Sequence, residues 1–445
     1  MTLNRKLHLR ASVCILALCA AATGAQATDG YFVEGASARE QALGGAGSAN
    51  PGDSLTNANN PAGLVDVGHQ INGDISAFAP TRGYNASGTM LTAPGAVSSG
   101  RDIFAIPTLG YAVPLSADSA LGASMVANGG MNTSYSGAIP NAVCAGYHSP
   151  MQGVFCGGRA GVDLNQALIS IGYAQRFGNL SVGVAPILAV QMFSAYGLGA
   201  MGMFGLSSNP AELTNHSPSY SVGGGVRAGA LYKVSEQFSI AVTGSTPLWM
   251  SPFQNYSGLF AGAGSFNIPG TVGTGVAYRI TPDVTIMADY KRIFYSGVKS
   301  VADAMAPMGP GSLGTANGPG FGWRDVDVVS LGVEWKYSKQ LTLRAGYSHN
   351  TQPVTAANVM LNIMAPGVIT DHISAGMTWN CNRNSSIDFA AVFAPRQSVT
   401  GQEYFPGLGY VPGSKISIYL SEFQATLGYT YHFGAPEPVA VAAKY

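Results

Sequence analysis

Charged residues are scarce in this chain. Only 22 Lys and Arg and 22 Asp and Glu occur among its 445 residues, about 10% of the chain, whereas soluble domains carry about 25%. The balanced charge disfavours binding to nucleic acid, so we expect no nucleic-acid partner. A soluble chain with so few charges would also be poorly protected against association. The composition therefore favours an outer surface that faces lipid.

Long hydrophobic runs are also missing from most of the chain. After residue 27, no apolar run approaches the about 20 residues that a transmembrane helix needs. Any membrane span must then be made by strands that close into a barrel. Disorder is disfavoured, because 47% of the residues are hydrophobic and 10% are aromatic.

Residues 1–27 have the pattern of a cleaved signal peptide. Arg5, Lys6 and Arg10 precede the apolar run 11–22, and residues 25–27 form a small-x-small cleavage pattern. A run of about 12 residues is too short for a membrane anchor. A lipoprotein at Cys19 is disfavoured, because the large residue Leu18 precedes it. We expect export to the bacterial outer membrane.

Only three cysteines follow this segment. Cys144 and Cys156 lie close together in a Gly-rich stretch, and an oxidising compartment favours a disulfide between them. A metal site that includes His148 is the alternative, but no second cluster completes a tetrahedron. We therefore expect neither a metal nor a cofactor, and the role of Cys381 stays open.

Apolar and polar residues alternate along many segments. In residues 417–433 the odd positions include Phe423 and Leu427, whereas the even positions include Gln424 and Thr426. A soluble sandwich or propeller would also alternate, but it would carry charges on its outer face. The pattern instead predicts an all-β fold, a transmembrane antiparallel β-barrel of about 14 strands spanning residues 70–433. The expected strands are residues 70–79, 104–114, 120–128, 166–177, 180–193, 220–234, 238–249, 271–279, 284–294, 326–337, 341–348, 372–380, 387–393 and 417–433.

Short turns and long loops alternate along the chain. Residues 178–179 and 338–339 are tight turns, whereas residues 194–219, 295–325 and 394–415 are long and rich in Gly and Pro. Outer-membrane barrels have this asymmetry, with short periplasmic turns and long extracellular loops.

Two segments fall outside the strand pattern. Residues 28–69 contain two expected short helices, at 37–43 and 53–60. A barrel of about 14 strands has a lumen too wide for its own side chains to fill, so we expect residues 28–69 to form a hatch inside it. Residues 434–445 contain two prolines, which forbid a further strand, and we expect a periplasmic tail of unknown role.

Residues 39–47 and, above all, the sequence Asn-Pro-Ala-Gly-Leu at 60–64 resemble the long-chain fatty acid transporter (FadL/TodX) family of outer-membrane proteins. The closing residues 427–433 and the order of the parts are also similar. The resemblance implies a monomeric 14-stranded barrel and a hatch that bears Asn60, Pro61 and Ala62. It also implies passive uptake of hydrophobic small molecules, such as fatty acids or hydrocarbons, with outer-membrane lipid and lipopolysaccharide around the barrel.

Apolar side chains in two long loops are the candidate ligand-binding residues. The alternative is that these side chains only pack the loops against each other. The set comprises Leu198, Met201, Met203, Phe204, Leu206, Trp249, Phe253, Leu259 and Phe260.

Alternation places Arg227, Lys291 and Arg344 on the lumen side of their strands, where a cation could receive a carboxylate head group. The alternative is that lumen charges pair with one another, Glu334 with Arg344 and Asp289 with Lys291.

Enzymatic chemistry finds little support, because the histidines are scattered and no nucleophile motif or phosphate-binding Gly motif occurs. An outer-membrane lipase and a general polar porin are the competing functions.

Pro61 is expected to turn the chain at Asn60, whose side chain would satisfy open backbone groups at the helix end. We expect the ligand to be captured by the apolar extracellular loops and released past a hatch that moves. The alternative is a fixed plug with sideways release through the barrel wall.

Overall fold

The computed structural model describes residues 28–146 and 152–434. The expected signal peptide at 1–27 and residues 435–445 of the expected tail lie outside these residues. Every helix in the described part of the chain is too short or too polar to cross a bilayer.

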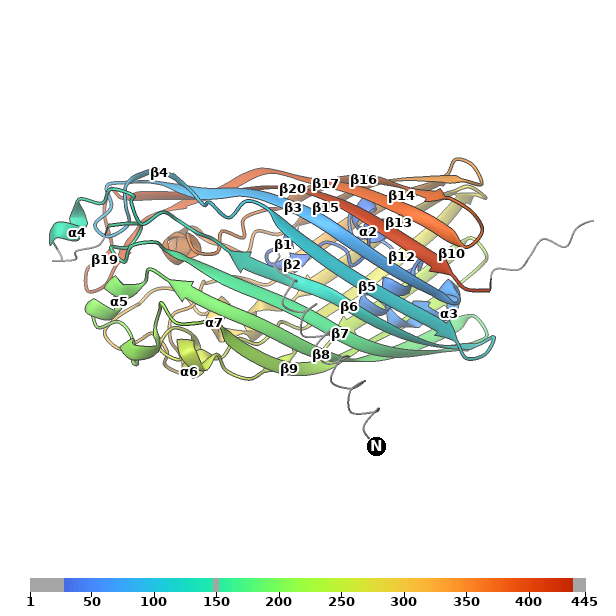
Figure 1. Cartoon of the computed structure of the whole chain (residues 1–445), viewed down its shortest axis with the longest axis horizontal. Helices are drawn as coiled ribbons and strands as arrows, with labels where there is room; N and C mark the ends of the chain where they lie inside the picture. Colours follow the sequence, from blue (N-terminus) through green and yellow to red (C-terminus); the bar gives the residue numbers. More distant parts are fainter. Residues whose placement is uncertain (1–27, 147–151, 435–445) are drawn as a thin grey trace, which may run out of the picture.

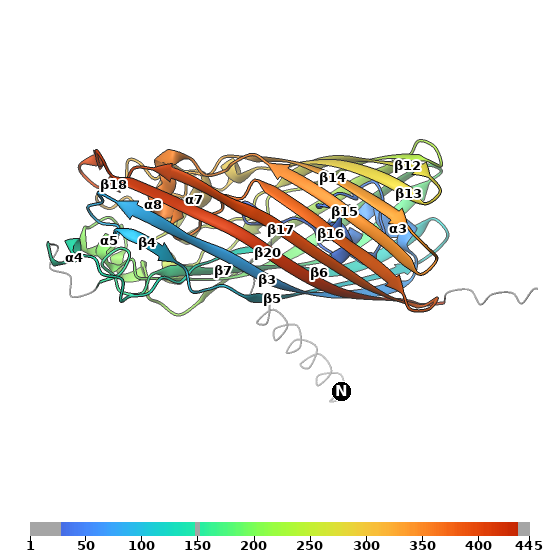
Figure 2. The same cartoon turned by 90° about the horizontal axis from the view of Figure 1, so that it is seen from above.

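Fourteen long strands form one closed antiparallel barrel (Figures 1 and 2). Each strand pairs with its neighbours in the chain, β9 pairs with β10, and the last strand β20 pairs with the first, β3, which closes the ring. The barrel strands are β3 (Gln70–Ser87), β5 (Phe104–Pro114), β6 (Ser119–Asn132), β7 (Gly161–Phe177), β8 (Leu180–Tyr196), β9 (Ser219–Lys233), β10 (Phe238–Ser245), β12 (Thr271–Thr281), β13 (Val284–Ile293), β14 (Val326–Lys336), β15 (Leu341–Asn350), β16 (Asp371–Asn380), β17 (Ser385–Gly401) and β20 (Lys415–His432).

The predicted all-β barrel fold is confirmed, and a strand is present at each predicted segment. Several strands are longer than predicted, because they continue beyond the apolar alternation into the region of the long loops. The segment predicted at 238–249 is divided: β10 ends at Ser245, and Trp249–Met250 form the separate short strand β11, which pairs with β9. Pro247, which cannot donate a backbone hydrogen bond, lies between them.

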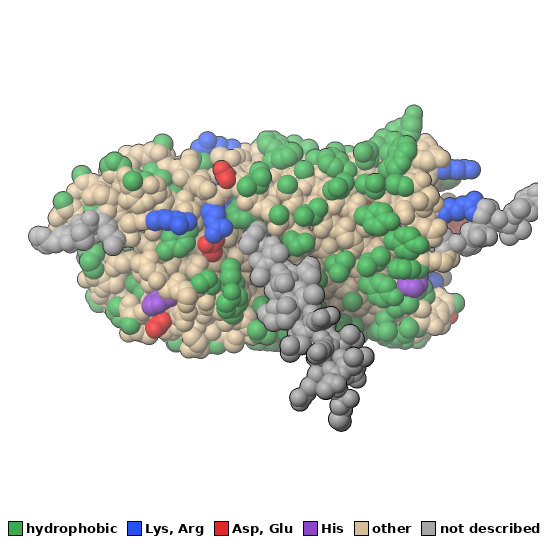
Figure 3. All heavy atoms as spheres, viewed as in Figure 1, with side chains coloured by type: hydrophobic (Ala, Val, Ile, Leu, Met, Phe, Trp, Pro, Cys, Tyr) green, Lys and Arg blue, Asp and Glu red, His purple; other side chains and the backbone are tan. Residues whose placement is uncertain are grey.

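Alternate residues on the strands face opposite sides of the wall. On β20, Phe423 and Leu427 are 49% and 55% exposed, whereas Gln424 and Thr426 between them are each 1% exposed. Figure 3 shows hydrophobic side chains gathered over the half of the barrel nearer the short turns, while the half nearer the long loops is mainly polar. The outer surface thus carries an apolar band of the kind that faces lipid.

Short elements fill the ends of the barrel and its interior. One of them is the short strand β4 (Gly95–Ser98), which pairs with β3. The remaining elements are β1 (Thr28–Asp29), β2 (Phe32–Val33), α2 (Ala38–Ala42), η1 (Ser54–Ala58), η2 (Pro61–Gly63), α3 (Leu64–Val67), α4 (Val143–Gly146), α5 (Gly199–Met203), η3 (Pro210–Glu212), η4 (Gln254–Tyr256), α6 (Ala261–Gly264), η5 (Tyr295–Gly297), α7 (Lys299–Ala302), η6 (Ala356–Asn358), α8 (Val359–Asn362), β18 (Tyr404–Phe405) and β19 (Gly409–Tyr410).

Residues 28–69, which we call the hatch, lie inside the barrel (Figures 1 and 2). The side chain of Ser37 caps α2 by accepting a hydrogen bond from the backbone N–H of Glu40, and Asp53 caps η1 in the same way. The second expected helix is therefore present as a 3-10 helix. The hatch is tied to the wall by polar contacts, among them Arg39 Nε to Glu334 Oε2 at 3.1 Å.

Strand β6 departs from the regular barrel in its second half. The β6–β7 register shifts between Ala127 and Gly129, which leaves Asn128 as a bulge. Residues 126–132 are all buried, so the alternation of the wall is lost there. Pairing between β5 and β6 extends only from Leu109 with Met125 to Pro114 with Ala120. In the described chain, residues 126–132 of β6 therefore have no ladder partner on the β5 side. We call this stretch the wall interruption.

Candidate functional site

An apolar cavity of about 40 Å³ lies among the long loops. Four of the predicted ligand residues, Leu198, Met201, Leu259 and Phe260, line it together with Phe193 from the end of β8. Further lining residues come from residues 300–321 and 361–364, so four loop regions and the barrel meet there. We call this cavity the loop pocket.

The other predicted loop residues lie around the loop pocket or away from it. Leu206 and Phe253 are fully buried in the same hydrophobic cluster, and Phe204 packs against that cluster. Met203 and Trp249 are 59% and 61% exposed and do not line the pocket. Packing between the loops therefore accounts for Leu206 and Phe253.

Phe193 was missed because it was assigned to a strand rather than to a loop. Its ring lies 4.6 Å from Phe260 and 4.9 Å from Tyr256, measured between ring centroids. An aromatic residue at the lumen-facing end of a strand next to a long apolar loop is the signal that could have found it.

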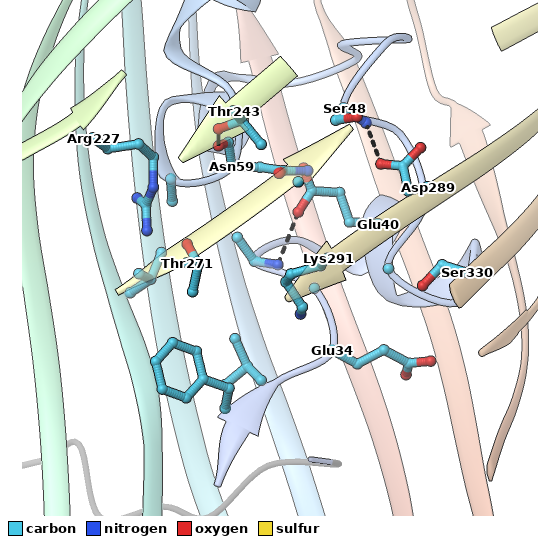
Figure 4. Close-up of a pocket in the computed structure, with 18 of the residues that line it drawn as sticks. Glu34, Glu40, Ser48, Asn59, Arg227, Thr243, Thr271, Asp289, Lys291 and Ser330 are labelled. Atoms are coloured by element: carbon cyan, nitrogen blue, oxygen red, sulfur yellow. Dashed lines mark hydrogen bonds between the residues drawn. The ribbon is translucent and has the colours of Figure 1, made fainter. Parts of the chain in front are cut away.

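A second cavity, of about 110 Å³, lies where the hatch meets the wall (Figure 4). The hatch contributes Phe32, Glu34 and Glu40 to its lining, and the wall contributes Arg227 and Lys291. Val126, Ala127 and Asn128 also line it, so this lumen cavity reaches the wall interruption of β6. Phe32, Glu34, Glu40 and the bulge were not predicted as site residues.

The predicted lumen cations differ in their partners. Arg344 Nε lies 2.8 Å from Glu334 Oε2, as expected. The expected pair of Asp289 with Lys291 is wrong: Lys291 Nζ lies 2.7 Å from Asp29 Oδ2, and Asp289 accepts hydrogen bonds from backbone N–H groups of the hatch. The hatch brings its own donors and acceptors into the lumen. Asp289 and Lys291 of β13 therefore bind groups of the hatch and do not pair with each other.

Arg227 is the exception among these cations. Its side chain points into the lumen cavity from β9 (Figure 4), and within the described residues no ion pair or hydrogen bond holds it. Glu40 lies in the same cavity, but its carboxylate accepts hydrogen bonds from Ala36 N and Asn59 Nδ2 instead. Glu40 attracts the Arg227 guanidinium through space without a direct contact, so the N–H groups of this guanidinium can receive an anionic or strongly polar group in the cavity.

The hatch motif sits against β9. Pro61 occupies the first position of η2, and Asn60 before it is extended. Asn60 Oδ1 accepts from Ala62 N at 3.1 Å, so the side chain satisfies the start of the following helix rather than the end of the preceding one. Asn60 Nδ2 donates to Ser48 O and to Ala230 O of the wall. A Cβ on Gly229 would lie 2.1 Å from Asn60 Oδ1, so only glycine permits this approach.

A disulfide joins Cys144 of α4 to Cys156, and α4 lies at the long-loop end of the barrel (Figure 1). Cys381 is exposed near the short turns and is a free thiol. No group of three or more metal-ligating side chains is found in residues 28–146 and 152–434.

A plugged outer-membrane β-barrel with an apolar pocket among its loops is the class that this geometry defines. Residues 14–427 match the profile of a family described as outer membrane protein transport protein (OMPP1/FadL/TodX). The chain belongs to this family, and it is an outer-membrane transport protein for hydrophobic compounds.

Solved structures share the fold. The P. putida toluene transporter TodX is 18% identical, with a TM-score of 0.65 over 90% of this chain and 99% of that one. A Pseudomonas aeruginosa FadL homologue is 15% identical, with a TM-score of 0.64 over 91% and 100%. The Ralstonia pickettii toluene transporter TbuX is 17% identical, with a TM-score of 0.59 over 90% and 99%. No curated protein gives a significant sequence match.

Proposed function

We propose that this protein takes up small hydrophobic compounds in three stages: capture by the apolar loop residues around the loop pocket, binding in the lumen cavity, and exit beside β6. The observation that carries this proposal is that the lumen cavity reaches Val126, Ala127 and Asn128, where β6 has lost its pairing with β5. A passive route needs no energy source, only apolar surface on the outside and a path that avoids bulk water.

The size of the lumen cavity favours compounds of about one aromatic ring. Its volume is about 110 Å³, whereas an engineered cavity of about 150 Å³ binds benzene. A long acyl chain would need further space. Two of the structurally similar proteins are described as toluene transporters, so monoaromatic hydrocarbons are the first compounds to test.

Arg227 supports a second class of ligand. A ring-sized compound that carries a carboxylate could place its apolar part against Phe32 and Leu168 and its charged end against Arg227. The proposal gives this role to neither Lys291 nor Arg344, because Lys291 is paired with Asp29 and Arg344 with Glu334 and Asp388.

The hatch enters the proposal as a fixed plug. Arg39, Asn57 and Asn60 each bond to the wall, and Asp66 pairs with both Arg176 and Lys233. Moving the hatch would break these bonds together, whereas exit at the wall interruption leaves them in place. Release past a shifted hatch is the alternative route.

The remaining features of the proposal concern the mature protein. The signal peptide would be removed after Ala27, residues 434–445 would form a periplasmic tail, and the barrel would act as a monomer in contact with outer-membrane lipid and lipopolysaccharide. No enzymatic step is part of the proposed mechanism.

The test is uptake of labelled toluene, benzoate and oleate by cells with and without the protein, at concentrations that limit the rate. Deletion of Asn128 would remove the bulge and let β6 pair regularly with β7. We expect toluene uptake to fall to the level of cells without the protein, while the barrel still folds and resists heat in detergent.

The controls separate the competing functions. Equal uptake of all compounds with and without the protein contradicts transport. Leakage of sugars through cells that carry the protein supports a polar porin, and release of fatty acid from phospholipid by the purified protein supports a lipase. Full uptake after deletion of Asn128 contradicts exit at β6, and a disulfide that locks the hatch then tests the route past it.

A further inference from the structure

A polar depression lies on the outer surface above the apolar band. It has a volume of about 330 Å³ and lies on three adjacent strands, β3, β17 and β20. These strands run side by side in Figure 2. Its lining includes Asn85, Ser87, Arg396, Ser398, Lys415 and Ser417. We call it the outer polar site.

The side chains of this site point away from the lumen. On β20, Ile416, Ile418 and Leu420 are 0%, 0% and 5% exposed and face inward, so Lys415 and Ser417 face outward. Arg396 and Ser398 are exposed on β17. Two cations and several hydrogen-bond donors therefore converge on the outer face, and acidic side chains do not contribute to the lining.

The height of the site follows from strand geometry. The outward apolar residues of β20 and its end run from Phe423 to Phe433. At about 3.3 Å per residue and a tilt of about 40°, these ten steps span about 25 Å, the height of the lipid-facing band in outer-membrane barrels. By the same geometry, Tyr419 lies about 10 Å and Lys415 about 20 Å above this band, so the site extends outward from the level of the outer-leaflet head groups.

The two cations of the outer polar site differ from paired arginines of the barrel in having no acidic partner among the described residues. Arg101 and Arg292, also toward the long-loop end, pair with Asp163 and with Asp325 and Asp327. Across the described chain, Arg396 and Lys415 have no acidic partner within ion-pair distance.

Asp371, on the neighbouring strand β16, does not neutralise the site. Its carboxylate accepts hydrogen bonds from Tyr347 and Thr370 and pairs with His349.

The side chain of Arg396 stacks on the ring of Tyr419. The centre of its guanidinium lies 3.7 Å from the centroid of the Tyr419 ring. Stacking on an aromatic face fixes the plane of the guanidinium and leaves its N–H edge free to donate, which suits bidentate binding of a phosphate.

We infer that the outer polar site binds a phosphate group of the outer-leaflet glycolipid, with Arg396 and Lys415 as its cationic ligands. Ser398, Ser417 and Asn85 supply neutral donors beside them. The inference rests on the outer-membrane placement in the proposed function, and it is independent of which compound passes through the lumen.

The test is native mass spectrometry of the protein extracted from the outer membrane and titrated with diphosphorylated lipid A. A cation near a charged membrane surface contributes about 1 kcal/mol, which corresponds to about fivefold in binding. Arg396→Gln and Lys415→Gln are each expected to retain about fivefold less lipid A, and the double variant about 25-fold less. The matched control, Arg292→Gln, removes the same charge from an arginine that is already paired and is expected to bind as the wild type does.

Three outcomes would overturn the inference. The first is equal retention by all variants, and the second is equal binding of enzymatically dephosphorylated lipid A to the wild type, which needs no variant to fold. The third is displacement of lipid A by millimolar inorganic phosphate, which would assign the site to a free ion. Uptake of hydrophobic compounds is measured on the same variants: loss of lipid A with normal uptake leaves the transport proposal intact, and failed uptake with normal lipid A binding leaves this one intact.

Discussion

Lys291 of the barrel wall and Asp29 of the hatch form an ion pair, with Nζ 2.7 Å from Oδ2. The Asp29 side chain is 1% exposed, and its carboxylate lies against this cation of the barrel wall. The pair joins the first described residues of the chain to β13, more than 250 residues later. The lumen is thus organised by contacts between the hatch and the wall rather than within the wall.

Arg227 is expected to discriminate between ligands by their charge. A hydrogen bond to a charged group contributes about 1.5–3 kcal/mol, which corresponds to at least about tenfold in binding. Arg227→Met should lower benzoate uptake about tenfold at limiting concentration and change toluene uptake less than about twofold, measured with labelled compounds in whole cells.

The controls for this prediction are Arg227→Lys and Arg292→Gln. Lysine keeps the charge and should retain part of the benzoate uptake, while Arg292 lies outside the lumen and its loss should have no effect. An equal fall in benzoate and toluene uptake for Arg227→Met would mean that this arginine only shapes the cavity.

Met201 and Met203 offer a matched pair for the loop pocket. Met201 is 1% exposed and lines the pocket, whereas Met203 is 59% exposed and lies outside it. Met201→Ala removes apolar contact with the ligand, and burial of such a side chain contributes about 1.5 kcal/mol or more. We expect about a tenfold rise in the toluene concentration that gives half-maximal uptake.

Met203→Ala should leave that concentration within about twofold of the wild type. If both variants behave alike, the loop pocket does not lie on the route, and the apolar loop residues serve only to pack the loops together.

Glu34 makes the hatch sensitive to pH. Burial, followed by the nearby Asp29, raises the pKa of Glu34 to about 8. The pKa in the folded protein lies above that of an unfolded Glu, near 4.3. Protonated Glu34 therefore contributes its full share to the free energy of unfolding below about pH 4.3, and this contribution is lost as the pH rises through about 8. The midpoint of thermal unfolding in detergent should be lower at pH 9 than at pH 5.

Glu34→Gln should flatten this pH dependence, because the amide does not titrate. Glu236→Gln, in an exposed short turn, is the control and should keep the full dependence. A pH profile that is the same in the wild type and in Glu34→Gln would show that other groups govern it.

The disulfide between Cys144 and Cys156 is expected to restrain one loop rather than the barrel. Closing a loop of about 12 residues reduces the freedom of the open chain by about 3 kcal/mol in the chain-entropy account. Reduction should make this loop cleavable by protease while the barrel keeps its resistance to heat. Peptide mapping of the unreduced protein should find the linked pair, and two free thiols in protein taken from the outer membrane would refute it.

The strands could be predicted because lipid on one side and a packed lumen on the other impose a two-residue period. Phe423, Gln424 and their neighbours carry that period in their chemistry, and the barrel follows from it. The partners of the lumen charges could not be predicted in this way. Asp29 and Glu34 are distant from β13 and β15 in sequence, and only the seating of the hatch brings them to Lys291 and Ser348.

The bulge of β6 has a signal in the sequence, a pair of adjacent glycines. The predicted strand stops at Asn128, immediately before Gly129 and Gly130. Paired glycines within a strand mark bulges or close approaches. Here a Cβ on Gly129 would lie 1.5 Å from the backbone oxygen of Tyr31, so the hatch passes directly against the bulge.

The pairing of β3 with β20 has a consequence for how the molecule is assembled. It joins Gln70 to His432 and continues to Ser87 and Lys415, with every residue of both strands in register. This seam pairs the first and the last strand of the barrel, so among the strand pairs of the barrel it joins the residues that lie farthest apart in sequence. The hatch precedes β3 directly and is enclosed once the seam is complete. The stretch of chain that fills the lumen therefore runs directly into one of the two strands of the seam, so a single segment both occupies the ring and helps to close it.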